Sequence, residues 1–163
     1  MKETITVLGN EIRIITNELG DYICLNDIWT AISEKPFYEI FWKFFKPKAN
    51  IEFLITWEKL SNDNFDEQKA IELLDWLATP TSLKHFISPK KWGETKQVGI
   101  FSKRGRHGGT YAHSDIALYF IMCANLAPEF LVYFTKAYQE FTQKSSEDLD
   151  SLKAIIAQMK NHQ

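Results

Sequence analysis

The residues best suited to chemistry crowd into one short segment, residues 102–113, which is basic and rich in glycine. Lys103, Arg104, Arg106 and His107 bring four basic side chains together, and three glycines permit a sharp turn among them. Basic side chains this close repel one another, so an anion outside the fold is expected to stabilise them. Lysine and arginine both bind phosphate oxygens, arginine through a planar fork. The segment therefore predicts contact with a polyanion such as a nucleic acid backbone.

Two other interpretations of this segment must be compared with contact to a polyanion. A basic loop that contacts only solvent would have the same composition, and the residues alone leave that alternative open. A loop that cradles a nucleotide phosphate is disfavoured, because Gly-Arg-His-Gly-Gly at residues 105–109 matches neither the P-loop nor the dinucleotide-binding glycine pattern.

The distribution of charge supports contact with a polyanion, although the net charge of −2 does not. Residues 84–113 contain seven lysines and arginines and one acid, Glu94, which gives this strip +6 and leaves −8 for the remainder. One basic strip on an acidic chain is typical of a domain that meets a polyanion on one face. We therefore add Lys90, Lys91 and Lys96 to the expected contact residues.

Several function classes are disfavoured by what the sequence lacks. It contains no nucleophile elbow and no HExxH motif, and a metal-dependent nuclease would need clustered acids where the basic strip has one. Cys24 and Cys123 lie among apolar residues and form no CxxC pair, so we expect two buried thiols and no zinc site. We expect no enzymatic activity, no metal and no cofactor.

Size and hydropathy indicate one domain away from membranes. A chain of 163 residues with 45% hydrophobic content can bury a sizeable core. The N-terminus lacks the basic and then apolar pattern of a leader, and no apolar run approaches ~18 residues. We therefore expect a cytoplasmic protein without a membrane partner.

The elements that must position the basic segment can be read from periodicity and turn residues. Strands are expected within residues 3–24, and Asn26 or Asp27 is expected to cap a helix that ends near Pro36. Residues 98–101 and 110–112 predict two strands around a turn at 105–109. Further helices are expected at residues 51–60, 67–78, 115–125 and 128–143, with a turn or short helix from Pro89.

Three residues in or near the basic segment invite a functional interpretation but favour a structural one. Trp92 and Tyr111 are expected to pack in the core more than to stack on bases. His113 is expected to make a structural hydrogen bond at the turn into the next helix.

Residues 37–45 are crowded with aromatic side chains, between which lies Lys43, with Lys46 and Lys48 just beyond. The aromatics favour a core or a subunit interface, while the lysines remain candidates for phosphate contact.

The last residues differ in composition from the rest. Lys144 and two serines predict a polar linker, followed by a short C-terminal helix, which divides the chain into residues 1–143 and 144–163. Apolar residues then recur with the 3-4-3 spacing of a two-heptad seam, at Leu149, Leu152, Ile156 and Met159. The seam either pairs two copies of the chain or packs on its own domain.

Several motifs together resemble the KilA-N domain family over roughly residues 5–141. The motifs are Ser-Pro-Lys-Lys-Trp at 88–92, Gly-Gly-Thr-Tyr-Ala-His at 108–113, Asp-Ile-Ala at 115–117 and Ala-Pro-Glu-Phe at 127–130, with further matches at 22–28 and 50–54. Members of this family are DNA-binding domains of large DNA viruses, phages and bacteria.

The resemblance implies an α+β fold like that of the fungal APSES domains. Such a fold has a small antiparallel sheet, a β-hairpin wing and several helices that include a helix-turn-helix-like pair. Residues 25–33 would then form the supporting helix, and residues 37–51 would hold the recognition helix with Lys43, Lys46 and Lys48 facing the groove. The wing tip would carry Lys103, Arg104, Arg106 and His107.

The expected function is therefore that of a phage-type or bacterial regulator that binds double-stranded DNA. Its C-terminal helix could pair two copies as a homodimer. The regulator would be associated with the nucleoid when bound. The alternative is a protein–protein interaction module, antitoxin-like or scaffolding, that uses residues 37–45 and the C-terminal helix. RNA in place of DNA stays open, because charge cannot separate the two.

Overall fold

A computed structural model describes residues 2–79, 86–124 and 128–162. Lys84 of the basic strip, the predicted helix end at residue 125 and Ala127 of the last motif lie outside these residues. Five strands form one antiparallel sheet in the order β1-β2-β3-β5-β4. They are β1 (Lys2–Val7), β2 (Asn10–Asn17), β3 (Gly20–Cys24), β4 (Ile100–Lys103) and β5 (Gly109–His113).

The sheet has one fully buried face and one that is covered in part. Ile12, Ile14 and Ile23 are completely buried on the first face, as expected for β-branched residues in strands. Because side chains alternate between the two faces, their neighbours Arg13 and Tyr22 point the opposite way. Arg13 is thereby placed on the face where it reaches His107, in the loop between β4 and β5.

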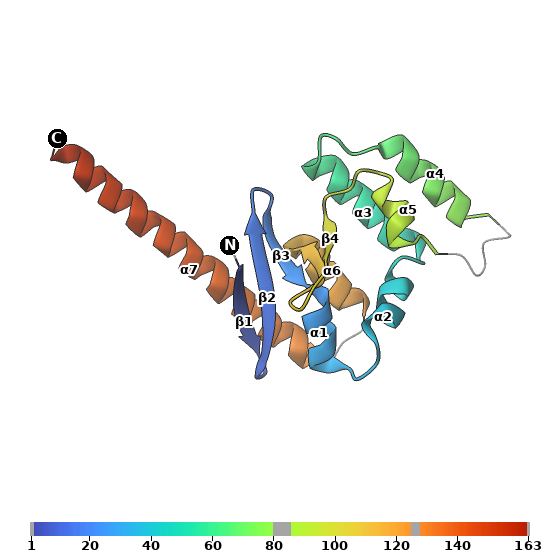
Figure 1. Ribbon diagram of the computed structural model, residues 1–163, viewed down its shortest axis with the longest axis horizontal. Helices are drawn as coiled ribbons and strands as arrows, with labels where there is room; N and C mark the ends of the chain where they lie inside the picture. Colours follow the sequence, from blue (N-terminus) through green and yellow to red (C-terminus); the bar gives the residue numbers. More distant parts are fainter. Residues whose placement is uncertain (1, 80–85, 125–127, 163) are drawn as a thin grey trace.

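Seven helices accompany the sheet in the part of the chain that is described. They are α1 (Leu25–Ile32), α2 (Phe37–Phe44), α3 (Lys48–Ser61), α4 (Glu67–Leu77), α5 (Pro89–Gly93), α6 (Ser114–Cys123) and α7 (Pro128–Asn161). Figure 1 shows α3, α4 and α5 grouped at one end of the molecule, while α7 passes beside β1 and projects beyond the sheet. The predicted α+β class with a small antiparallel sheet is confirmed.

The structure corrects two local predictions, one about the turn between β1 and β2 and one about the start of the first helix. The sequence favours a tight hairpin turn at Gly9 and Asn10, but the first hairpin turns at Leu8 and Gly9, both with positive φ, one residue earlier. Helix α1 begins at Leu25, and neither Asn26 nor Asp27 caps it. Both side chains instead have distant partners, Thr110 and Arg13.

The C-terminal helix also differs from the prediction. Where a polar linker was expected after residue 143, α7 continues through Lys144 without a break. Lysine and serine are compatible with a helix in solvent, and the helix is already anchored upstream by buried Phe130 and Phe134. The apolar seam is exposed, so the alternative prediction that it packs on its own domain is wrong. The division of the chain at residue 143 stays a prediction.

The two cysteines have different environments. Cys24 is buried as expected, but Cys123 is exposed at the end of α6, so the prediction of a second buried thiol is wrong. Of its apolar neighbours in sequence, Ile121 is buried but Met122 is 64% exposed, so apolar residues beside a cysteine do not ensure that it is buried. Within the described ranges, no helix is both long and apolar enough to cross a membrane.

A buried carboxylate ties α3 to the chain that leads into β4. Glu58 is 1% exposed and accepts hydrogen bonds from the Gly99 amide at 2.8 Å and the Val98 amide at 3.0 Å. The Asn62 side chain donates a third bond at 3.0 Å. Burial nevertheless raises the pKa of Glu58, because removal from water penalises the charged form more than these bonds favour it.

The raised pKa of Glu58 predicts a pH dependence of stability. The folded protein binds this proton more tightly than the unfolded chain does. The stabilising contribution is therefore complete below the unfolded pKa and is lost as pH rises through the folded pKa. Glu58→Gln keeps one oxygen acceptor but does not titrate. Its free energy of unfolding should therefore increase relative to that of wild type as pH rises from the unfolded to the folded pKa of Glu58.

Urea unfolding of both proteins across this pH range measures the difference. A gap between the two proteins that stays constant with pH would contradict the prediction.

Candidate nucleic-acid interface

The basic segment forms a hairpin wing whose backbone is shaped by glycines. Strands β4 and β5 pair with Phe101 opposite Tyr111 and Lys103 opposite Gly109. At the tip, Gly105 has a φ of +107°, a conformation that favours glycine. A Cβ at Gly108 would collide with the Lys103 carbonyl oxygen. The predicted turn between two strands is therefore present, with glycine where the backbone requires it.

The side chains at the tip face solvent. Lys103, Arg104, Arg106 and His107 are all exposed. In the described structure, no ion pair links any of them to an acidic side chain. Four cationic or titratable groups are thus presented together and are available to an anion.

The wing is held over the sheet by Arg13 of β2. Its guanidinium donates to both carboxylate oxygens of Asp27, with Nε to Oδ2 at 2.8 Å and Nη2 to Oδ1 at 3.0 Å. The Nη1 atom donates to the His107 carbonyl oxygen at 2.6 Å. Hydrogen bonding to Asp27 raises the pKa of Arg13, so the clamp stays charged. One side chain therefore joins β2, α1 and the wing.

A second contact fixes the return strand of the wing to α1. The Thr110 amide donates to Asn26 Oδ1 at 2.6 Å. Beside it, Gly109 lies so close to the sheet that a Cβ would be 2.9 Å from Cys24 Sγ and 3.4 Å from Arg13 Nη2. A larger residue at this position would push the wing away from the sheet.

Sequence analysis missed Arg13, and assigned Asn26 and Asp27 to a cap that α1 does not use. The partners of Arg13 lie 14 and 94 residues away along the chain, at Asp27 and His107, and spacing does not report such contacts. One feature of the sequence could have indicated Arg13. It is a charged residue between two isoleucines of an expected strand, and a charge beside a buried core needs a partner.

The structure confirms the structural interpretation of three residues near the wing. Trp92 and Tyr111 are buried, at 1% and 2% exposure, so neither ring is free to stack on bases. The Asp115 amide donates to His113 Nδ1 at 3.2 Å, which caps α6. The other ring nitrogen of His113, Nε2, lies 2.9 Å from the Leu19 carbonyl oxygen.

Three further lysines of the basic strip, Lys90, Lys91 and Lys96, lie in α5 or just after it. Lys90 and Lys96 are exposed, and the Lys91 ammonium lies 3.7 Å from the centre of the Trp76 ring. The start of α5 adjoins the base of the wing, because Pro89 and Ser102 line one cavity of about 310 Å³. The helix and the base of the wing are therefore neighbours.

The aromatic segment is divided by the periodicity of α2. Phe41, Phe44 and Phe45 are buried, whereas Tyr38 and Trp42 are 57% and 50% exposed. A core role is therefore confirmed for the first three. The exposed pair lines a cavity of about 400 Å³ together with Lys43 and with Lys46, which lies just beyond the segment.

The predicted recognition segment is not one helix. Pro47 separates α2 from α3, because proline lacks the amide that would continue the first helix. Lys48 begins α3 and pairs with Glu52 at 3.6 Å. Lys43 and Lys46 are thus placed near α2, and Lys48 belongs to the next helix.

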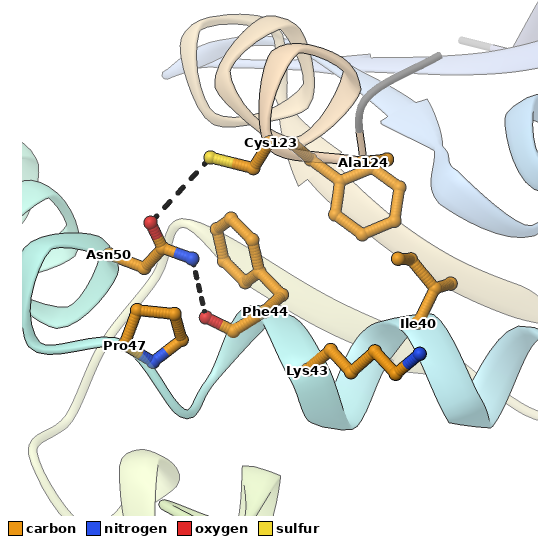
Figure 2. A pocket seen from close by; sticks show the side chains of 8 residues that line it. Ile40, Lys43, Phe44, Pro47, Asn50, Cys123 and Ala124 are labelled. Carbon is orange, nitrogen blue, oxygen red and sulfur yellow. Dashed lines mark hydrogen bonds between the residues drawn. The ribbon is translucent and has the colours of Figure 1, made fainter.

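A cavity of about 430 Å³ lies between α2, the start of α3 and the end of α6. Asn50 donates to the Phe44 carbonyl oxygen at 2.9 Å and accepts from Cys123 Sγ at 3.6 Å (Figure 2). Figure 2 shows the Lys43 side chain lying along α2 toward Ile40. This cavity is lined by other residues than the wing tip and does not enlarge the basic surface.

Removal of the Arg13 clamp should loosen the wing and destabilise the fold. Arg13→Ala leaves Asp27 and the His107 carbonyl without their partner, which should cost about 1–3 kcal/mol in urea unfolding. Hydrogen exchange at the Thr110 amide should accelerate as the wing separates from α1.

The control is Lys59→Ala, which removes an exposed ion pair with Glu67 and should cost about 0–1 kcal/mol. Unchanged protection at Thr110 in Arg13→Ala would refute the clamp.

Comparison with known proteins agrees with this geometry. The family model described as the KilA-N domain matches residues 6–144, which is most of the chain. Searches of curated proteins and of solved structures found no match. KilA-N domains are generally DNA-binding domains, and this chain belongs to the KilA-N domain family.

Proposed function

We propose that this protein is a phage-type or bacterial regulator that grips duplex DNA with its hairpin wing. The observation that carries the proposal is the wing tip, where Lys103, Arg104, Arg106 and His107 are exposed on a hairpin clamped from beneath. A preorganised group of cations binds phosphates without the cost of ordering a flexible loop. Such contacts set register and affinity on the duplex but do not by themselves read sequence.

Further contacts are proposed on both sides of the wing. Lys90, Lys91 and Lys96 around α5 extend the basic surface, although Lys91 is partly engaged with Trp76. We propose that α1 and α2, separated by residues 33–36, act as the helix-turn-helix-like pair. Lys43 and Lys46 would then lie toward the groove.

Lys48 would contribute from the start of α3, once its weak pair with Glu52 opens. A regulator of this kind would act in the cytoplasm and would be associated with the nucleoid while bound.

The double variant Arg104→Ala/Arg106→Ala tests the wing. It should weaken binding to a mixed-sequence duplex and lower the slope of log K against log salt by about one for each lost phosphate contact. Fluorescence anisotropy or gel shifts at several salt concentrations would measure both quantities.

The control double variant, Lys136→Ala/Lys144→Ala, removes the same charge from exposed positions of α7, outside the proposed interface. It should leave the slope near that of wild type. Equal slopes for wild type and the wing variant would overturn the proposal. Single-stranded DNA and RNA arms show whether the duplex is the preferred ligand, and stronger RNA binding would reassign it.

We also propose that the protein pairs with a second copy through α7. The seam of Leu149, Leu152, Ile156 and Met159 is between 44% and 65% exposed on a helix that projects from the sheet. With Leu149 at heptad position a, Asp148 takes position g and Lys153 takes position e. A parallel pair therefore sets Asp148 beside Lys153 of the partner subunit, an attraction that favours the parallel orientation.

Substitution within the seam should weaken that pairing. Leu152→Lys places a charge at position d and should lower the dimer fraction in sedimentation velocity at high protein concentration. Ala154→Lys, on the opposite face of α7, is the matched control and should sediment like wild type. A wild-type protein that stays monomeric at every concentration would remove the dimer from the proposal.

A protein–protein interaction module is the second candidate function. It is favoured by the exposure of Tyr38 and Trp42, since large exposed aromatics are enriched at protein interfaces. It predicts stable oligomers together with no retention of DNA at low salt. The anisotropy and sedimentation measurements therefore separate the two candidates.

A further inference from the structure

Three aromatic rings form an open cluster on the outer side of α2. Tyr38 and Trp42 are four residues apart, so they share the side of the helix that is turned away from buried Phe44. The Trp42 ring stacks on Phe86, with ring centres 4.9 Å apart and planes 20° from parallel, while the Tyr38 ring lies 5.9 Å from Trp42 at an angle of 60°. Trp42 is therefore supported from one side although half of the residue stays exposed.

The cavity that these rings border also has charged walls. Lys43 and Lys46 line it together with one acid, Glu39. None of these three side chains forms an ion pair with a residue that the structure describes. The site therefore combines exposed aromatic surface with a net positive charge.

An unpaired nucleobase matches this combination of groups better than an apolar protein segment does. Every base has a flat face that stacks on aromatic rings, and lysines beside the rings can bind the adjoining phosphates. An apolar peptide would use the rings but would place no acceptor opposite the two ammonium groups. The faces of a paired base are covered by its neighbours in the duplex, so the ligand must contain a base outside that stack.

We propose that Tyr38 and Trp42 stack on one unpaired base of DNA, while Lys43 and Lys46 contact the phosphates beside it. The inference rests on the proposed DNA-binding function and deepens it, because it adds a base outside the duplex to the DNA structures that the protein recognises.

The position of α2 allows this site and the wing to contact one DNA molecule. The inner side of α2 adjoins the base of the wing, because Phe41, Phe45 and Ser102 line one cavity. The wing then holds the duplex, and α2 holds a base displaced from it nearby.

Two DNA molecules of the same flanking sequence test the proposal, one fully paired and one with a loop of unpaired thymines at its centre. Wild type should bind the looped duplex more tightly in fluorescence anisotropy. Tyr38→Ala or Trp42→Ala should weaken binding to the looped duplex by about 5- to 140-fold, the effect of losing one stacked base. The ratio of the two affinities should thereby fall toward one.

Two further variants serve as controls. Tyr133→Ala removes a ring of α7 that is 50% exposed outside the site, and it should keep the wild-type ratio. Trp42→Phe retains an aromatic face and should keep most of the preference. If Tyr38→Ala and Trp42→Ala weaken binding to both DNA molecules equally, the effect is structural and the stacking role is refuted. A wild-type protein without preference for the looped duplex would refute it as well.

A photochemical crosslink tests the contact directly. Iodouracil in the unpaired loop bonds on irradiation to an aromatic ring that lies against it. Mass spectrometry of the wild-type complex should locate the crosslink at Tyr38 or Trp42, and crosslinks found solely at other residues would contradict the proposal.

The remaining outcomes separate this inference from the proposed function. If Arg104→Ala/Arg106→Ala loses binding to the paired duplex but wild type does not prefer the loop, only the site on α2 is refuted. If wild type binds neither DNA, the proposed function fails too. Tighter binding of a matching RNA loop would assign the site to RNA. Loss of self-association in Trp42→Ala with unchanged DNA binding would assign it to a protein interface, and either result overturns the inference.

Discussion

The guanidinium of Arg13 is the interaction on which the position of the wing depends, because it is bonded at once to a helix and to the hairpin. Asp27 neutralises its charge, so a cation can lie beneath a strongly basic loop without adding to the repulsion there. The His107 carbonyl then attaches the loop through a neutral group, which leaves the His107 ring outside the clamp. The fold thereby separates the cation that holds the wing from the cations that face outward.

Local signals predicted the parts of this arrangement that are local in origin. Glycines and β-branched residues predicted the hairpin of β4 and β5, and the proline at residue 89 predicted the start of α5. The contacts that position the hairpin could not be predicted in this way. Asn26 resembles a helix cap in sequence, yet its side chain is committed to Thr110, which lies 84 residues later. The competition between a local and a distant partner is decided by the tertiary structure, which residue spacing does not contain.

The aromatic segment shows how one composition can serve two purposes. Around α2, the side chains of Phe41 and Phe44 enter the core, while Tyr38 and Trp42, one residue away from inward positions, remain in solvent. Composition alone could not divide these rings, because the division depends on where the helix begins and on which of its faces meets α6 and the core. Helix α7 shows the same limit: serines 145 and 146 resemble a linker in sequence but lie within a continuous helix.

The wing keeps its shape through its backbone and not through the side chains at its tip. Gly108 is required beside the Lys103 carbonyl, and Gly105 supplies a left-handed turn. The side chains of Arg104 and Arg106 take part in no hydrogen bond or ion pair with the residues that the structure describes. Mutation at these two positions is therefore expected to alter the proposed DNA contact before it alters how the protein folds. Substitutions at the wing tip can therefore accumulate during evolution at little cost in stability.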